Sequence, residues 1–509
     1  MRWLLLVLAW IALPDSSPVR AQTLPSATGA QLARVHCATC HLFPEPRLLD
    51  QKTWREQTLP RMKIRLGLAP EQLDRQKFAD ILKTTTGFLK QPLLTPEQFD
   101  SIVAFYATEA PVTTAPQAPH LPIEADLDLF RFEPASDRSG DPATTMVRIS
   151  EVEHRIYVGD LNRRALTALN ASGSNEWTLP LNNIPVDIIR RTNDAIVTLI
   201  GSFMPTEERS GAVILLTNSV GRLLPSRTLL EGLARPVQTT VADLNGDGRE
   251  DLIVCQYGNN IGHFAWFEGQ RDGSWLEHLL VPKSGALCAE VRDLNGDGFP
   301  DIVALFAQET ESLYLLYNDG KGGFRQRTGF QRPPVFGHTH FEMVDFDGDG
   351  RLDYLITNGD NGEYPSPMKN YHGISVYLDR GGRYERAFFY PMNGAFKAIA
   401  RDFDGDGDLD IAAISFYPDF RNSPREGFVY LENIGGMKFK PHTIPEVSSG
   451  RWIVMDAGDV DGDGDLDIVL GSFIHGPTDV PDSMMLDWQK NGPAVAILRN
   501  QLMERRRKP

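Results

Sequence analysis

Two patterns of apolar and polar residues divide the chain near residue 110. Before this point, apolar residues recur every three or four positions over 28–41, 46–66, 69–84 and 95–108, which predicts α-helices. From about residue 125 to residue 500 the pattern changes to short apolar runs bounded by aspartate and glycine, which is typical of buried β-strands. The intervening residues 111–124 are rich in proline and lack periodicity, so they are predicted to form an extended linker.

The β-rich part contains a repeat. Five similar segments begin at residues 243, 293, 345, 402 and 459, with sequences such as DLNGDGRED and DVDGDGDLD. An apolar strand precedes and follows each segment, and an aromatic strand, a glycine turn and a last strand come after several of them. Two units without the acidic segment precede them, at about 125–181 and 182–230. The repeat therefore predicts seven four-stranded units that close into a ring, a β-propeller.

The acidic segments resemble the loops of FG-GAP/VCBS repeats, which form the propeller of integrin α subunits. The resemblance covers most of 125–500. The expected fold class is multidomain: a small all-α domain at 22–110, then an all-β propeller of seven four-stranded blades, and a basic tail at 501–509.

The acidic segments have the composition of calcium loops. Oxygen-bearing side chains occupy positions one, three, five and nine, and glycines at positions four and six permit a tight turn. Position twelve is apolar in every loop, which excludes an EF-hand. We expect about five structural Ca²⁺ ions, since the alternative, a solvated acidic turn, does not explain five loops in register. The predicted ligands are Asp243, Asn245, Asp247, Asp251, Asp293, Asn295, Asp297, Asp301, Asp345, Asp347, Asp349, Asp353, Asp402, Asp404, Asp406, Asp410, Asp459, Asp461, Asp463 and Asp467.

The stretch 35–41, VHCATCH, predicts one covalently attached haem c. Cys37 and Cys40 would add to the haem vinyl groups, and His41 would bind the iron. A thioredoxin-type pair lacks its βαβ context, and a zinc site lacks two further ligands. The helical region then resembles a small class I c-type cytochrome over about 28–110. Met62 is the favoured second iron ligand, against the alternative that it fills the core.

The N-terminus and the overall charge bear on location. Arg2, an apolar run over 3–13 and a small-residue site ending at Ala21 predict a cleaved signal peptide at 1–21. No later run is long enough to span a membrane. The formal charge of −16 argues against nucleic-acid partners. The mature chain is therefore expected to be soluble and exported, either periplasmic or extracellular.

The face opposite the acidic loops is the expected ligand face. Its loops at 358–373, 417–427 and 473–494 are long and rich in aromatic and charged residues. Residues at the starts of the innermost strands would surround the axial mouth and bind an anionic or carbohydrate ligand, unless they only satisfy backbone groups. These residues are Arg235, His338, His340, Lys397, Arg451 and Trp452. Cys255 and Cys288 lie on adjacent blades, as either a disulfide or two buried thiols.

These features favour an exported c-type cytochrome that transfers single electrons to a redox partner protein, with the propeller as a docking platform. One alternative is a haem-linked oxidoreductase acting on a small substrate bound to the propeller. Another is an adhesion or carbohydrate-binding propeller protein. The sequence contains no catalytic motif above chance, so an electron-transfer role is favoured over a dehydrogenase.

Overall fold

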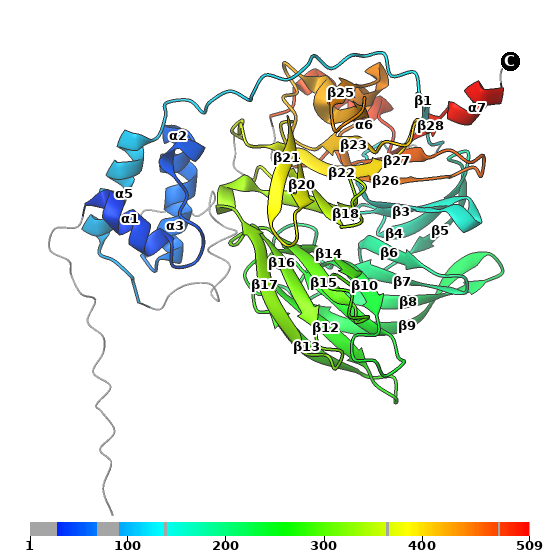
Figure 1. Ribbon diagram of the computed structural model, residues 1–509, viewed down its shortest axis with the longest axis horizontal. Helices are drawn as coiled ribbons and strands as arrows, with labels where there is room; N and C mark the ends of the chain where they lie inside the picture. Colours follow the sequence, from blue (N-terminus) through cyan, green and yellow to red (C-terminus); the bar gives the residue numbers. More distant parts are fainter. Residues whose placement is uncertain (1–27, 69–90, 137–139, 363–365, 477–478, 508–509) are drawn as a thin grey trace, which may run out of the picture.

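The computed structural model describes residues 28–68, 91–136, 140–362, 366–476 and 479–507. The predicted signal peptide and the whole of the predicted helix at 69–84 lie outside these residues. Within them, a propeller of seven four-stranded antiparallel sheets lies beside a group of short helices (Figure 1). The predicted number of blades and of strands per blade is therefore confirmed.

The strands of each blade follow one another from the innermost, at the propeller axis, to the outermost. The blades are β2 (Thr144–Ser150), β3 (Arg155–Asp160), β4 (Ala165–Asn170) and β5 (Asn175–Pro180); β6 (Pro185–Arg190), β7 (Asp194–Leu199), β8 (Gly211–Ser219) and β9 (Arg222–Leu233); β10 (Pro236–Ala242), β11 (Asp251–Gln256), β12 (His263–Gly269) and β13 (Trp275–Val281); β14 (Ala286–Arg292), β15 (Asp301–Phe306), β16 (Ser312–Asn318) and β17 (Phe324–Gln331); β18 (His338–Val344), β19 (Asp353–Asn358), β20 (Gly373–Asp379) and β21 (Tyr384–Pro391); β22 (Ala395–Arg401), β23 (Asp410–Ser415), β24 (Phe428–Asn433) and β25 (Phe439–His442); and β26 (Trp452–Gly458), β27 (Asp467–Ser472), β28 (Val495–Asn500) and β1 (Phe130–Pro134).

The last blade closes the ring by combining the two ends of the β-rich part. Strand β1 pairs antiparallel with β28, with Phe130 opposite Asn500 and Pro134 opposite Ala496. The predicted first unit at 125–181 is therefore wrong in its boundaries, because the first complete blade begins at Thr144. Pairing strands from both ends covers the sheet edges that an open ring would expose.

A shared irregularity shapes the centre of the propeller. Every innermost strand has a register shift after its first residue, where it pairs with the second strand. Such bulges bend a strand and re-aim the side chains that follow. At several junctions, a side-chain oxygen beyond the bulge then accepts a backbone N–H of the next blade. The pairs are Asp187 with Thr239 (3.3 Å), Gln238 with Ala289 (2.6 Å), Glu290 with Met343 (3.1 Å), Glu342 with Ala400 (2.8 Å) and Asp456 with Ile149 (2.8 Å).

The helical part has its own core. Its helices are α1 (Gly29–Cys37), η1 (Pro46–Leu48), α2 (Gln51–Thr53), the π-helical turn η2 (Trp54–Thr58), α3 (Leu59–Arg65) and α5 (Pro96–Glu109). Thr28 and Thr95 cap α1 and α5 with capping boxes, which confirms the predicted start of the last helix. Helices α1 and α5 cross closely at Gly29, where an added Cβ would lie 2.0 Å from the carbonyl oxygen of Ser101.

The helical part packs against the propeller. Val335, in the 3₁₀ turn η4 (Pro334–Phe336), joins the core of the helices, and Phe336 and Tyr371 pack against it. The Tyr371 hydroxyl donates to the carbonyl oxygen of Leu48 over 3.1 Å, and Arg65 lies 3.6 Å from Glu309. The helices therefore lie against the β15–β16 and β19–β20 connections of two neighbouring blades and against the β17–β18 connection that joins these blades.

Two segments outside the blades complete the fold. The predicted linker runs along the propeller to reach β1 (Figure 1). There the Thr443 N–H donates to the Glu124 carbonyl oxygen, and the Glu124 N–H donates to the Pro441 carbonyl oxygen. The predicted basic tail forms α7 (Leu502–Arg507), whose Met503 N–H donates to Asp465 in the last acidic loop. The remaining short elements are η3 (Glu151–Glu153), η5 (Pro424–Gly427), η6 (Pro445–Ser449) and α6 (Asp482–Asn491). Among the helices of the described ranges, we find none with an apolar stretch that could cross a membrane.

Candidate functional site

The predicted haem motif lies at the end of helix α1. Cys37 is the last residue of the helix and is half-buried, while Cys40 is exposed in the following turn. Burial, together with the nearby Cys40, raises the pKa of the Cys37 thiol to about 11. The His41 Nδ1 lies 2.8 Å from the carbonyl oxygen of Leu42, so Nδ1 donates and Nε2 is left as the ligating nitrogen. Two free thiols and an oriented imidazole are a donor set that fits covalent haem.

The surroundings of this motif include the propeller. Burial lowers the pKa of His41, and the nearby Glu309 of the β15–β16 connection partly offsets this effect. Arg65, at the end of α3, lies close to both groups. The predicted second ligand, Met62, is on α3 with a half-buried side chain. Its ligation of iron stays a prediction.

The five acidic loops share one rim of the propeller. Each connects an innermost strand to the second strand of its blade, as in the β18–β19 connection. Glycines four and six of that loop, Gly348 and Gly350, have φ values of 72° and 84°, which favour glycine. Their N–H groups donate to the two carboxylate oxygens of Asp345 over 2.8 Å each.

The ninth position of each loop is a buried anchor. In the third loop, Asp353 accepts the Phe346 N–H over 2.9 Å and the Asp379 N–H over 2.8 Å, so one carboxylate joins the loop to the third strand. The other loops repeat this arrangement. Burial raises the pKa of Asp410 and of Asp467 to about 7. The ninth position therefore has a structural role beyond any contact with metal.

Three of the loops gather carboxylates closely enough to hold a cation. In each of the third, fourth and fifth loops, three carboxylate oxygens lie within 4.8 Å of one another. The triads are Asp345, Asp347 and Asp353; Asp402, Asp404 and Asp406; and Asp459, Asp461 and Asp467. Clustered hard oxygen donors fit Ca²⁺. Asn245 and Asn295 replace one carboxylate in the first two loops, so those loops carry less charge.

Most of the predicted ligand-face residues are internal and do not form an exposed cluster. Arg235 donates to the carbonyl oxygens of Ser202, Phe203 and Gly258, and so ties two blades together. Arg451 has an equivalent role, with bonds to the carbonyl oxygens of Phe416 and His475. Burial lowers the pKa of both guanidinium groups.

The remaining ligand-face residues divide between the core and the axis. Trp452 is fully buried and donates to the Val447 carbonyl oxygen, and His338 is buried beside Glu311. His340 and Lys397 lie near Arg148 of another blade, whereas the sequence had placed all six around the axial mouth.

Charged residues from several blades meet at this axis. Arg148 lies 2.9 Å from Asp187 and 3.7 Å from Asp456, which are on the two neighbouring innermost strands. Burial lowers the pKa of the Lys397 amine, and the nearby positive charge of Arg148 lowers it further. Asp187, on another blade, is close enough to act on this pKa in the opposite direction. This set has no signature in the sequence, because Arg148 is more than 200 residues from Lys397 and Asp456, and they come together only when the ring closes.

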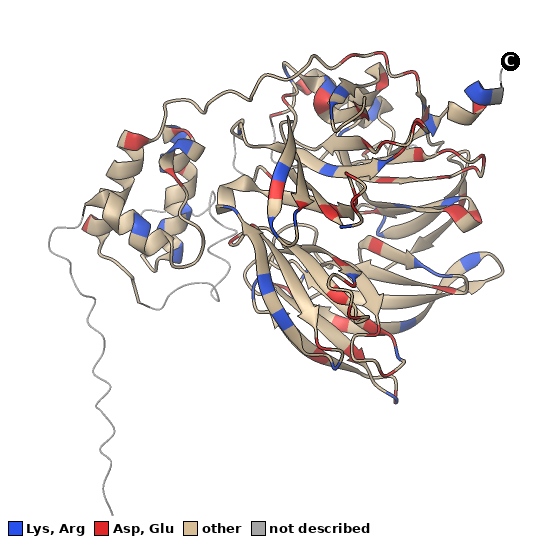
Figure 2. Ribbon diagram, viewed as in Figure 1, with Lys and Arg blue, Asp and Glu red and all other residues tan. Residues whose placement is uncertain are grey.

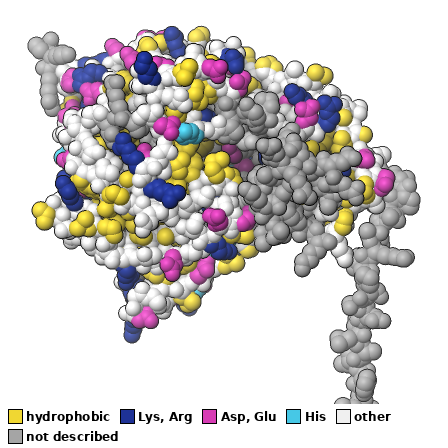
Figure 3. All heavy atoms as spheres, turned by 180° about the vertical axis from the view of Figure 1, so that it is seen from behind, with side chains coloured by type: hydrophobic (Ala, Val, Ile, Leu, Met, Phe, Trp, Pro, Cys, Tyr) yellow, Lys and Arg dark blue, Asp and Glu magenta, His cyan; other side chains and the backbone are white. Residues whose placement is uncertain are grey.

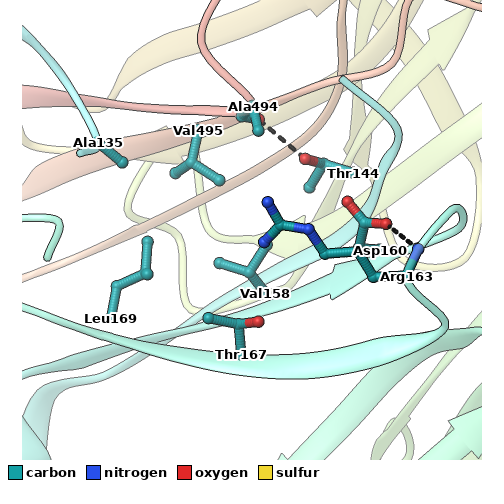
Figure 4. A pocket seen from close by; sticks show the side chains of 9 residues that line it. All are labelled: Ala135, Thr144, Val158, Asp160, Arg163, Thr167, Leu169, Ala494 and Val495. Atoms are coloured by element: carbon teal, nitrogen blue, oxygen red, sulfur yellow. Dashed lines mark hydrogen bonds between the residues drawn. The ribbon is translucent and has the colours of Figure 1, made fainter. Parts of the chain in front are cut away.

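A cavity between the first and last blades, lined by Thr144, Asp160 and Arg163 among others, has a volume of only about 20 Å³ (Figure 4). It has room for one water molecule and not for a ligand.

Cys255 and Cys288 are free thiols, of which Cys255 is fully buried. Of the two options that the sequence left open, the structure has free thiols and no disulfide, with Cys288 only partly buried.

The comparisons with known proteins concern the propeller. Residues 243–304, 293–356 and 402–470 match the model of the FG-GAP-like repeat, and these segments include all five acidic loops. The blades that carry the acidic loops are therefore similar to FG-GAP-like repeats. Among solved structures, the N-terminal domain of Nup159 is similar at 9% identity and a TM-score of 0.41, over 76% of this chain and 99% of that domain. A complex of an S. cerevisiae Dbp5 variant with Nup159, a Gle1 variant, IP6 and ADP is similar at 9% identity and a TM-score of 0.39, over 75% of this chain and 98% of the other. No curated protein matches the sequence.

Proposed function

We propose that the protein is an exported binding protein whose FG-GAP propeller, stabilised by calcium on one rim, presents a rigid platform to an anionic or carbohydrate ligand. The observation that carries this proposal is the division of the propeller into two unlike faces. One rim has five short loops with anchored carboxylates, and the other has long aromatic loops and the docked helices. Short metal loops fix the blades, and long loops on a rigid scaffold are where binding residues concentrate.

The distribution of surface charge favours binding of an anionic ligand at a specific site over general electrostatic attraction to the whole protein. Acidic and basic side chains are interspersed on the strands and on the face seen from behind (Figures 2 and 3). With a formal charge of −16, the whole molecule repels anions, so an anionic ligand needs a local concentration of arginine.

Removal of calcium is expected to weaken both stability and binding. Each site filled at 100 times its dissociation constant contributes about 2.7 kcal/mol to the free energy of unfolding. We expect a chelator to lower the thermal midpoint of the wild type, and added Ca²⁺ to restore it. Titration with a panel of neutral and acidic oligosaccharides, with and without chelator, measures binding.

The cysteine variants provide the control for this experiment. Cys37→Ser combined with Cys40→Ser removes the haem motif and leaves the propeller intact, so binding should not change. If a chelator leaves the thermal midpoint of unfolding unchanged, calcium has no structural role. If none of the oligosaccharides binds, the propeller is not a platform for such ligands.

A second candidate function, electron transfer, is favoured by the geometry of residues 37–41. Cys37, Cys40 and His41 would hold a covalent haem, with His41 Nε2 as the iron ligand and the Leu42 carbonyl fixing the ring. When bound, haem supplies one-electron chemistry. The chain itself contributes the orientation of His41 and the packing of α1 against α5, and a redox partner protein would receive or supply the electron.

An absorption spectrum tests this second function. We expect protein exported with haem-attachment machinery to show a low-spin spectrum with a sulfur-to-iron band, because Met62 would complete a His/Met pair. Met62→Ala should abolish the band while leaving haem attached, whereas Cys37→Ser should reduce covalent attachment on a denaturing gel. A high-spin wild type that is indifferent to Met62→Ala would contradict the assignment of Met62. Wild-type protein without covalent haem would contradict the cytochrome function.

A further inference from the structure

An open cleft lies between the outer parts of two neighbouring blades, away from the axial mouth. Its principal walls are β17 and the residues just beyond it, β20, and the turn that leads into β21. The main lining residues are Arg327, Phe330, Arg332, Tyr377, Arg383 and Tyr384. The cleft has a volume of about 430 Å³, which is within the range of small-molecule sites.

The cleft is a local concentration of positive charge. Figure 2 shows basic segments along β17 and around the start of β21. Three guanidinium groups line the cleft, and among the described lining residues there is no carboxylate. Arg327 and Arg383 are exposed, so their N–H groups can reach a ligand. Arginine donates paired hydrogen bonds to carboxylate, sulfate and phosphate groups.

The walls of the cleft are aromatic and ordered in advance. The rings of Phe330 and Tyr377 stack with centroids 5.2 Å apart and an interplanar angle of 21°. The Arg332 guanidinium lies 5.8 Å and 6.0 Å from these two centroids, and it donates to the Tyr377 hydroxyl over 2.9 Å. A ligand would therefore meet a fixed wall, which lowers the entropic cost of binding.

Two glycines keep the cleft open. Gly382 has a φ of 83°, and an added Cβ there would lie 2.9 Å from a terminal nitrogen of Arg327. Arg327 therefore crosses the turn and donates to the Gly382 carbonyl oxygen, which holds the guanidinium at the edge of the cleft. An added Cβ on Gly329 would lie 3.2 Å from the Tyr384 ring.

The cleft also adjoins the surface on which the helices dock. Arg332 lies 6.0 Å from the centroid of Phe336, which stacks on Tyr371 at 4.4 Å. Tyr371 in turn donates to Leu48 of the helical part. A ligand in the cleft would thus lie beside the helices that carry the haem motif.

We propose that this cleft binds an anionic oligosaccharide. Arg327 and Arg383 pair with a carboxylate, sulfate or phosphate group on a sugar, and Tyr377 and Tyr384 contact the apolar face of the sugar ring. A free inorganic anion would leave the aromatic walls and most of the volume unused. The proposal rests on the role of the propeller as a binding platform, and it gives that role a ligand class and a place.

Paired arginine variants test the proposal on the full-length protein. The probe is a heparin-derived hexasaccharide, with maltohexaose as the neutral match and inorganic sulfate as the free anion. Arg327→Gln with Arg383→Gln removes the exposed cleft charges. Arg325→Gln with Arg386→Gln removes the same charge from exposed positions on β17 and β21 that do not line the cleft.

The expected result is a dissociation constant at least about tenfold higher for the cleft pair, and within about twofold of the wild type for the control pair. Maltohexaose should not compete, and sulfate should compete only at far higher concentration. Equal losses in both pairs would show general attraction and overturn the proposal, as would a wild type that does not bind the hexasaccharide. If other oligosaccharides bind the wild type and the Arg327→Gln, Arg383→Gln variant equally well, the cleft is not the binding site. The proposed role of the propeller as a binding platform would then still stand. Thermal midpoints of the variants show whether each is folded.

Discussion

Asp467→Ala is expected to lower the free energy of unfolding of the propeller by about 3–5 kcal/mol, because it breaks a buried ion pair on one side only. Asp467 is fully buried, and its carboxylate lies 2.6 Å from Arg499. It also accepts the N–H groups of Val460 over 3.2 Å and of Asn500 over 2.8 Å. The substitution leaves a buried guanidinium and two buried amides without this partner. Both Arg499 and Asn500 lie on β28, the strand that β1 closes upon, so the loss falls on the closure of the ring.

Urea unfolding followed by tryptophan fluorescence measures this effect, with chelator present so that calcium does not contribute. Asp479→Ala is the matched control, since Asp479 is 65% exposed and its ion-pair partner among the described residues is Arg421, which is also exposed and lies 3.1 Å away. Such a surface pair contributes about 0–1 kcal/mol. Asp467→Asn should have an intermediate effect, because the amide oxygen still accepts hydrogen bonds. If the free energy of unfolding of Asp467→Ala lies within about 1 kcal/mol of that of the control variant, the buried Asp467 carboxylate is dispensable for stability.

Gly29→Val is expected to separate α1 from α5. It should lower the free energy of unfolding of the helical part by several times the ~1–3 kcal/mol that ordinary overpacking costs. Even a Cβ at this position would lie 2.0 Å from the Ser101 carbonyl oxygen and 2.8 Å from its carbonyl carbon. The obstacle is backbone and not a flexible side chain, so the two helices must move apart. The separation opens the core that contains Leu32, Phe99 and Ile102.

Hydrogen exchange of the full chain resolves this change by segment. We expect faster exchange in α1 and α5, with little change in the propeller strands. Ala107→Val is the control, because Ala107 is exposed on α5 and a valine there costs only its helix propensity, roughly half a kcal/mol. Unchanged protection of α1 in Gly29→Val would mean that the crossing does not hold the helical part together.

The sequence by itself determined the features that repeat or that are local. Seven blades of four strands follow from the spacing of the acidic loops and the apolar runs, because every blade except the last forms from consecutive residues. The sequence also placed all five loops on one rim, because each loop follows the same strand of its blade. The motif from Cys37 to His41 is likewise contained within five residues. The carboxylates that come together in three of the loops were equally readable, since those of each loop come from one nonapeptide.

Only the tertiary structure decided what depends on residues far apart in the chain. The pairing of β1 with β28 moved the first blade boundary from residue 125 to Thr144, because a ring must be closed by strands from both of its ends. Burial decided the roles of Arg235 and Arg451, whose carbonyl partners on neighbouring blades have no signature in sequence. The cleft of Arg327 and Arg383 exists only because two outer strands of different blades lie face to face. A guanidinium serves the core or a ligand according to which groups surround it, and only the packed fold sets those surroundings.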